Sequence, residues 1–491
     1  MRHILYTFLL IAVVGSSCHK QVLDIDPQNL LYSELAYSTP AKIEANVIAT
    51  YDGLQSKDFL SGRALVYIDL LGEDIYDRNN FFTELPRFNL LSNSGIVAGV
   101  WTAGYDAIAR ANRAIAGVTE NSSKLDGTTK AREYIAECKF VRAVANFYLV
   151  NFFAQPYNFT ADASHIGIPI ITKSFTYNDP EANQPRSTVA EVYALIIKDL
   201  TEALADLPLA YTGYANNTYH TKTRGTKAAA SAFLSRVYLY KGDYANAKKF
   251  SKDVIDGAYG TYGLNSNVST VYTSGASQYN TNETIWSIPA NINDNPSSNV
   301  SLSQHYSPTS RADLAVSSIF LDETKNKYFS SDDKRRALII SGTGQLASTR
   351  FTGKYTSLTD WAPILRYAEV LLTYAEAQAR TTAAIDADAL AKLNLVRDRA
   401  RVGKPQYTAG SFANFNEFID AILGERHVEL AFEGHRFWDL MRVKASVTNK
   451  FDSDGSTIMP VQAFGSLKNV FPIPQLEVDK SKKVLAQNEG Y

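Results

Sequence analysis

The stretch from Glu425 to Arg442, which reads ERHVELAFEGHRFWDLMR, constrains the fold more than any other part of the chain. At helical spacing its apolar and small side chains fall on two faces, with Val428, Phe432, His435 and Trp438 on one and Leu430, Gly434, Phe437 and Met441 on the other. A helix with two such faces must lie between other helices. The stretch therefore predicts one helix, preceded by a partner at about 414–424, inside a mainly α-helical protein.

Two details of the same stretch predict specific contacts. Gly434 costs about 1 kcal/mol relative to Ala in the middle of a helix, so we expect a close approach of another element there. Oppositely charged side chains three residues apart are expected to pair along the helix, namely Glu433 with Arg436 and Asp439 with Arg442.

Further helices are expected along most of the chain. Pro40–Leu54 predicts the first, and a capping box of Thr188 and Glu191 begins another at about 188–207. Residues 227–256 match a tetratricopeptide-like helical hairpin at Leu234, Tyr238, Gly242, Tyr244 and Ala247. One such hairpin cannot bury its apolar face alone, so helices at about 130–153, 363–380 and 388–402 are expected to pack with it. The predicted fold class is mainly α, a tetratricopeptide-like helical-repeat scaffold.

The first forty residues read as an export signal followed by a tether. Arg2 precedes an apolar run, Ile4–Val14, that is shorter than the ~20 residues needed to span a bilayer. Small residues then lead to Cys18, which favours cleavage after residue 17 and lipidation of Cys18. A plain signal peptide with an incidental cysteine is the alternative. We expect residues 1–17 to be a signal peptide and residues 18–40 to be a lipid-anchored tether.

Charge and motif content argue against several classes of function. The formal net charge is −1 and no basic block occurs, so nucleic-acid binding is unsupported. The sequence has no phosphate-binding loop, nucleophile elbow or HExxH zinc motif, so we expect no catalytic residue, no metal and no cofactor. Asp and Glu are numerous, however, and a glycoside hydrolase needs only two carboxylates. Cys138 lies on an apolar helical face and is expected in the core.

Residues 257–310 differ from the rest because they contain no Lys or Arg and only two acidic residues, Glu283 and Asp294. Asn, Ser, Thr, Gly and Tyr dominate, which predicts long loops with a short strand near 283–288. An aromatic ring covers the C–H face of a sugar while amides reach its hydroxyl groups. The candidate ligand-binding residues here are Tyr272, Tyr279, Asn293 and Tyr306, whereas Trp286 is expected in the core. The alternative is that these tyrosines pin the loops to the helices.

A second candidate zone is the segment from Asp74 to Phe88, within a stretch, Leu65–Ser94, that reads as irregular. It combines aromatic faces with groups that form paired hydrogen bonds. The candidate residues are Asp74, Tyr76, Arg78, Phe81 and Phe82. Phe81 and Phe82 could equally anchor a loop in the core.

Four ordered segments closely resemble the SusD/RagB family of outer-membrane lipoproteins. They are Ala136–Tyr157 (AECKFVRAVANFYLVNFFAQPY), Pro363–Arg380 (PILRYAEVLLTYAEAQAR), Glu425–Arg442 and Phe471–Gln475 (FPIPQ), and the final NEGY fits as well. The resemblance implies one SusD-like domain over residues 41–491, with a loop-rich ligand-binding insertion at about 257–350. It also implies that loops from the two candidate zones form one shallow binding surface.

The resemblance further implies a function. Members of the family are surface-exposed lipoproteins that bind a nutrient and deliver it to a SusC-like TonB-dependent transporter in the outer membrane. The low charge of residues 257–310 favours an oligosaccharide as the ligand. The alternatives are a peptide, as for RagB-like relatives, and, in other classes, a glycoside hydrolase or a helical-repeat adaptor without a small ligand.

Overall fold

The computed structural model describes residues 33–491 except 176–178, 273–280, 298, 402, 455 and 460. The expected signal peptide, Cys18, most of the tether and Tyr279 lie outside the described residues. Within the described part of the chain, no helix combines the length and apolar character that crossing a bilayer requires.

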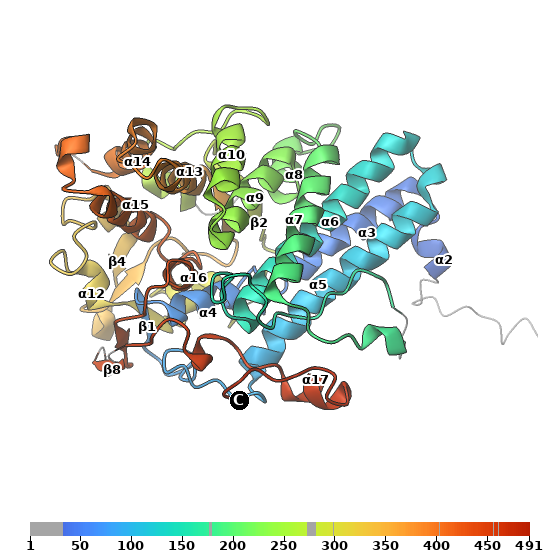
Figure 1. The fold of residues 1–491 in the computed structure, drawn as a ribbon, viewed down its shortest axis with the longest axis horizontal. Helices are drawn as coiled ribbons and strands as arrows, with labels where there is room; N and C mark the ends of the chain where they lie inside the picture. Colours follow the sequence, from blue (N-terminus) through green and yellow to red (C-terminus); the bar gives the residue numbers. More distant parts are fainter. Residues whose placement is uncertain are drawn as a thin grey trace, which may run out of the picture.

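The main body is a row of helices, each packed against its neighbours in the chain or the next hairpin. They are α3 (Pro40–Leu54), α5 (Gly95–Glu120), α6 (Gly127–Phe153), α7 (Val189–Asp206), α9 (Lys227–Lys241), α10 (Tyr244–Ile255), α13 (Tyr367–Thr382), α14 (Ala387–Ala400) and α15 (Phe415–Glu429). Figure 1 shows α3, α5, α6 and α7 together at the right, α13, α14 and α15 at the left, and α9 and α10 between them. The expected helical-repeat scaffold is confirmed.

The remaining elements are short and flank this row. The helices are α2 (Ser33–Ala36), α4 (Arg63–Leu71), α8 (Asn217–Thr223), α11 (Leu302–Tyr306), α12 (Ser318–Leu321), α16 (Arg436–Arg442) and α17 (Gln475–Lys480). The strands are β1 (Ile75–Asp77), β2 (Thr284–Ile288), β3 (Leu314–Val316), β4 (Ile339–Ser341), β5 (Arg350–Thr352), β6 (Ala362–Arg366), β7 (Lys450–Phe451) and β8 (Thr457–Met459). They form antiparallel pairs β1–β3, β2–β6, β4–β5 and β7–β8. The expectation that 65–94 is wholly irregular is wrong, because α4 and β1 lie in it.

The helical hairpin α9–α10 has the predicted turn. Gly242 ends α9 with a φ of 78°, a conformation in which glycine avoids the strain that a side chain would cause. The side chain of Asp243 then caps α10 by accepting a hydrogen bond from the backbone N–H of Asn246. Tyr238 and Phe250 stack between the two helices with ring centroids 5.5 Å apart. Cys138 and Trp286 are fully buried in the main core, as expected.

The stretch 425–442 is not one helix. α15 ends at Glu429, the chain turns, and α16 begins at Arg436. Phe432 and Gly434 have φ values of 66° and 73°, which a continuous helix cannot contain. The predicted close approach at Gly434 is present, since its N–H donates to the Asp69 carboxylate at 3.0 Å and a Cβ there would lie 3.0 Å from Leu65 Cδ2.

The charges of this stretch enter a buried ion network instead of pairing only along a helix. Asp439 does pair with Arg442 at 2.7 Å. Glu433, however, binds Arg366 and Lys354 at 2.8 and 2.7 Å, and Arg436 binds Glu73. The network around Glu433 also contains Glu283, Asp333, Arg335, Arg399, Glu425 and Glu429, all buried or nearly so. It joins α15, β6 and α14 to the insertion after α10.

Candidate ligand-binding surface

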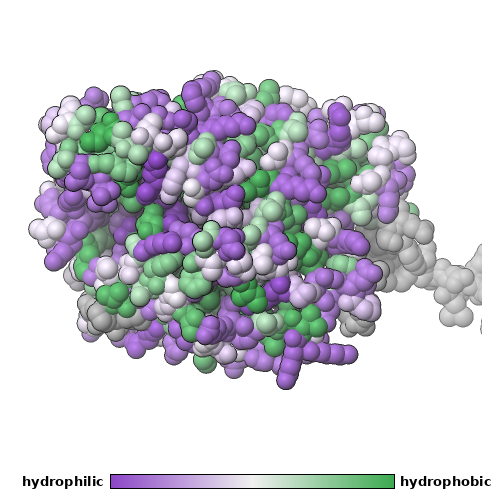
Figure 2. Space-filling view, viewed as in Figure 1, coloured by the Kyte–Doolittle hydropathy of each residue, from purple (hydrophilic) through white to green (hydrophobic). Residues whose placement is uncertain are grey.

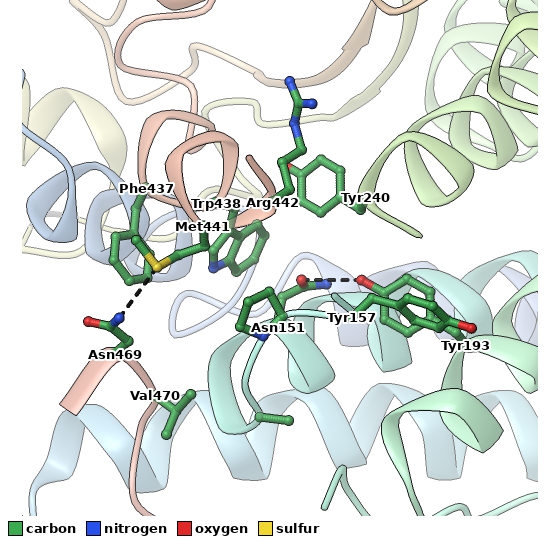
Figure 3. A pocket seen from close by; sticks show the side chains of 12 residues that line it. Asn151, Tyr157, Tyr193, Tyr240, Phe437, Trp438, Met441, Arg442, Asn469 and Val470 are labelled. Atoms are coloured by element: carbon green, nitrogen blue, oxygen red, sulfur yellow. Dashed lines mark hydrogen bonds between the residues drawn. The ribbon is translucent and has the colours of Figure 1, made fainter. Parts of the chain in front are cut away.

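A small cavity beneath α16 is part of the core and not a ligand site. Figure 3 shows Trp438 of α16 near Asn151 and Met441 pointing toward Asn469, whereas the Arg442 side chain points away from both. The enclosed volume is about 10 Å³, which is close to the minimum for one water molecule. The buried Trp438 Nε1 has no hydrogen-bond partner among the described residues, so a single water fits this position.

The pairing of β1 with β3 brings the two candidate zones together. Ile75, Tyr76 and Asp77 lie opposite Val316, Ala315 and Leu314. The loop that follows β1 therefore lies beside the loop that precedes β3, although more than 200 residues separate them in the chain. The loops of the two candidate zones therefore meet at the ends of an antiparallel ladder.

Hydrogen bonds hold the loop after β1 in one conformation. The Asp77 carboxylate accepts from the backbone N–H groups of Phe81 at 3.0 Å and Phe82 at 2.6 Å. Arg78 Nε donates to the carbonyl oxygen of Ala312 at 2.9 Å, and the Asn79 amide donates to the carbonyl of Arg311 at 2.9 Å. The tip of the loop is thus fixed mainly through backbone atoms of the 311–313 segment.

Phe81 and Phe82 take the two roles that the sequence left open. Phe82 is 2% exposed and packs under the loop, whereas Phe81 is 43% exposed. The rings meet edge to face with centroids 4.8 Å apart. The Arg311 guanidinium lies 4.2 Å from the centroid of the Phe81 ring, which is within cation–π range. Phe82 is therefore the anchor, and Phe81 presents an aromatic surface to solvent.

Polar groups surround the exposed ring. Arg311 Nη1 donates to Asn299 Oδ1 at 3.1 Å, and its Nε lies 3.2 Å from the Asp313 carboxylate. Asp313 also binds His305 at 2.8 Å. Burial lowers the pKa of His305. We call Arg78, Asn79, Phe81, Asn299 and Arg311 the Phe81 surface.

Tyr272 and Tyr306 are buried and do not reach this surface. Tyr272 is 6% exposed, and its hydroxyl donates to Glu433 at 2.7 Å. Tyr306 is 1% exposed, and its hydroxyl donates to Asp69 at 2.6 Å. The expectation that these two rings contact a ligand is wrong in this structure, because each is used to pin the insertion onto the helical body. Burial raises the pKa of Asp69 to about 8, which reflects how far this contact lies from solvent.

The other predicted residues lie elsewhere. Tyr76 is half-buried and packs against the small cluster around Phe351. Asp74 is buried and contacts His427 at 2.5 Å, on the side of β1 away from the loop tip. Asn293 is exposed in a turn that its backbone N–H makes with the Asn291 side chain.

Sequence reasoning missed Arg311 as a member of the surface, and it considered Asn299 without selecting it. Arg311 is the first residue after the segment 257–310, which was selected for lacking basic residues. Asn299 was one amide among several in that segment, and no local pattern distinguished it. On the face shown in Figure 2, hydrophobic residues occur as small groups among hydrophilic ones, so hydropathy gives no additional guide. Among the described residues, no cluster of His, Cys, Asp or Glu has a metal-binding arrangement.

Comparison with known proteins identifies the family. The sequence model described as "SusD family" matches residues 343–491, and the one described as "Starch-binding associating with outer membrane" matches residues 35–239. The chain belongs to the SusD/RagB family. Similarity to one SusD-like protein, P2 of Formosa agariphila, is 26% identity over 99% of both chains.

Solved structures of the SusD superfamily have the same fold. A putative sugar-binding protein from Bacteroides vulgatus is 27% identical, with a TM-score of 0.78 over 92% of this chain and 99% of that one. A SusD superfamily protein from Bacteroides fragilis is 25% identical, with a TM-score of 0.76 over 91% and 99%. The SusD-like fold with its tetratricopeptide-like helices thus extends over nearly all of the described chain.

Proposed function

We propose that the protein is a surface-exposed lipoprotein that binds an oligosaccharide at the Phe81 surface and delivers it to a SusC-like TonB-dependent transporter. The observation that supports this proposal most directly is the exposed ring of Phe81 on a loop fixed by Asp77, with Arg311 and Asn299 beside it. A rigid aromatic face with hydrogen-bonding groups around it suits a neutral, hydroxyl-rich ligand. The sugar-binding description of the Bacteroides vulgatus relative is consistent with this choice.

Binding affinity for oligosaccharides tests the site. Phe81→Ala removes the exposed ring, and we expect the dissociation constant to rise by roughly 5- to 100-fold, since loss of one stacked aromatic costs about 1–3 kcal/mol in nucleic-acid complexes. Phe159→Ala is the matched control, because Phe159 is 38% exposed outside this surface. Isothermal titration calorimetry against neutral oligosaccharides measures both. Equal affinities for the two variants would remove Phe81 from the site.

The same titration separates the alternative ligands and activities. A panel that includes oligopeptides distinguishes a RagB-like peptide binder, which would bind peptides and no sugar. Incubation with polysaccharides, followed by an assay for new reducing ends, tests for glycoside hydrolysis. We propose binding without turnover, so no new reducing ends are expected.

The anchor and the transporter are tested in cells. Lipidation of Cys18 would tether the protein to the outer membrane, because a multiply acylated cysteine holds a bilayer firmly. Cys18→Ala is therefore expected to move the protein into the soluble fraction when the transporter is absent. Protease treatment of intact cells tests surface exposure, and co-purification with a SusC-like transporter tests the partnership. In this mechanism the protein acts as a lid that closes the ligand into the transporter.

A further inference from the structure

A second concave region is lined by the residues just before β1, whereas the Phe81 surface follows the end of β1. It is a cleft of about 680 Å³ between α12, α15 and α16, which lie together at the left of Figure 1. A volume of 300–1,000 Å³ is typical of pockets for small molecules. The cleft and the Phe81 surface have no residue in common among those described. We call it the α15–α16 cleft.

The floor of the cleft contains a buried carboxylate that is only half satisfied. Asp74 is 2% exposed, and its Oδ1 lies 2.5 Å from Nε2 of His427. Its Oδ2 is buried and has no hydrogen-bond partner among the described residues. A buried carboxylate oxygen normally accepts a hydrogen bond, since leaving it without one costs about 1–3 kcal/mol or more. The floor therefore holds a carboxylate oxygen whose capacity to accept a hydrogen bond is unused.

An unused donor lies in the same floor. Arg436 binds Glu73 through Nη2 at 2.9 Å, while its buried Nε has no partner among the described residues. Glu73 itself is satisfied, because it also accepts from the backbone N–H and hydroxyl of Thr448. Glu73, the partner of Arg436, directly precedes Asp74 in the chain, and all three residues line the cleft. A hydroxyl group, which both donates and accepts, suits such a pair.

The walls and the charge balance narrow the chemistry of the ligand. Phe320, Leu423 and Leu440 give the cleft an apolar side, against which C–H groups can pack. The charged lining residues apart from His427 are four acids and four bases: Glu73, Asp74, Asp420 and Asp439, and Lys325, Lys327, Arg380 and Arg436. This balance favours a neutral ligand over an anion or a cation. A sugar matches this lining, because it is neutral and has hydroxyl groups at its edge and C–H groups on its face.

We propose that the α15–α16 cleft is a second carbohydrate site, which binds one or two units of a neutral sugar independently of the Phe81 surface. Asp74 accepts a hydrogen bond from a sugar hydroxyl, Arg436 donates one, and His427 holds the Asp74 carboxylate in place. The enclosing helices limit the ligand to a short saccharide or the end of a longer chain. This site goes beyond the proposed function, which needs only the Phe81 surface.

The test uses the purified mature protein and eight probes: the sugars glucose, galactose, mannose, xylose, maltose and cellobiose, and the amino acids glycine and lysine. Ligand-observed NMR and calorimetry are carried out on wild type, Phe81→Ala, Asp74→Asn and Leu423→Trp. Leu423→Trp fills the cleft without touching its hydrogen bonds, so it covers the case in which Asp74→Asn does not fold. Leu395→Trp is its control, because Leu395 is 52% exposed on α14 and lies outside the cleft lining.

We expect at least one sugar probe to bind wild type, Phe81→Ala and Leu395→Trp within about twofold of one another. The same probe should bind Leu423→Trp, and a folded Asp74→Asn, at least about tenfold more weakly. The proposal is overturned if no sugar probe binds Phe81→Ala, if Leu423→Trp binds within twofold of wild type, or if glycine or lysine binds the cleft and no sugar does. Failure of the proposed function is distinct, because it appears as unchanged affinity of Phe81→Ala for oligosaccharides that are too long for the cleft.

Discussion

Replacing Arg366 with Met tests whether the buried ion network holds the C-terminal helices onto the rest of the fold. Arg366 is 2% exposed and donates five hydrogen bonds, to the carboxylates of Glu283, Glu429 and Glu433 and to the carbonyl of Glu429. Met has a similar length and no charge. The substitution therefore leaves three buried carboxylates with one cation fewer.

The size of the effect follows from the partners that remain. Arg399 still binds Glu283 and Glu429, and Lys354 still binds Glu433 at 2.7 Å. Because no carboxylate is left without a cation, the loss should match one broken buried pair, about 3–5 kcal/mol, and not three. The free energy of unfolding of a typical domain is about 5–15 kcal/mol, so this loss is a large fraction of it.

Urea unfolding at pH 7, followed by circular dichroism and Trp fluorescence, measures the difference. Arg87→Met is the control, since Arg87 and Asp452 pair at 2.6 Å with side chains that are 50% and 31% exposed. Such a surface pair contributes at most about 1 kcal/mol. If Arg366→Met lowers the free energy of unfolding by no more than Arg87→Met does, the buried ion network does not hold the C-terminal helices onto the rest of the fold.

Three further outcomes are expected. Burial would raise the pKa of Glu433, but the positive charges of Arg366 and Lys354 outweigh burial and hold that pKa at about 2. The ionised Glu433 side chain therefore stabilises the fold fully above about pH 4.5, and this contribution is lost as the pH falls toward 2. In Glu433→Gln, the free energy of unfolding should depend less steeply on pH in this window. Gly424→Ala places a Cβ 2.0 Å from Tyr328 Cδ2 and should cost about 1–3 kcal/mol by urea unfolding, whereas Gly95→Ala meets open space and should change stability by less than about 0.5 kcal/mol. Burial raises the pKa of the Cys138 thiol, which makes it unreactive in the folded protein. In Cys18→Ala protein, a thiol reagent should therefore label no cysteine in the folded state and one cysteine in urea. Labelling of the folded protein would contradict the buried position of Cys138.

The sequence predicted helix boundaries well where the residues that determine a boundary lie close to it in the chain. α3 has the predicted bounds because Thr39 caps it and Pro40 occupies its first turn. The capping box of Thr188 and Glu191 forms at the start of α7, as expected. In each case the residues that determine the boundary lie within four positions of it.

Predictions failed where the partner is distant in sequence. Residues 363–366 continue the helical pattern of α13, yet they form β6 because β2, about 75 residues earlier, pairs with them. The break at 430–435 depends on Asp69, which accepts the Gly434 N–H from across the fold. No periodicity within residues 363–380 or 425–442 could indicate these contacts.

The same limit applied to the binding surface. An abundance of Tyr indicated a ligand, but Tyr306 has a buried carboxylate as its partner, Asp69, which is 237 positions away in the chain. The segment from Asp74 to Phe88 stays a prediction as a ligand-binding region, and its aromatic pair could be divided into anchor and exposed ring only once β1 had a partner strand. Composition thus located the loops, while tertiary contacts determined which side chains face outward.

The loop that carries Phe81 is held by the Asp77 carboxylate, by backbone carbonyls and by a three-residue ladder, none of which involves the Phe81 ring. A substitution at position 81 therefore leaves the hydrogen bonds and the strand pairing that hold the loop intact. New ligand preferences could therefore evolve by single substitutions at the tip without remodelling the protein beneath it.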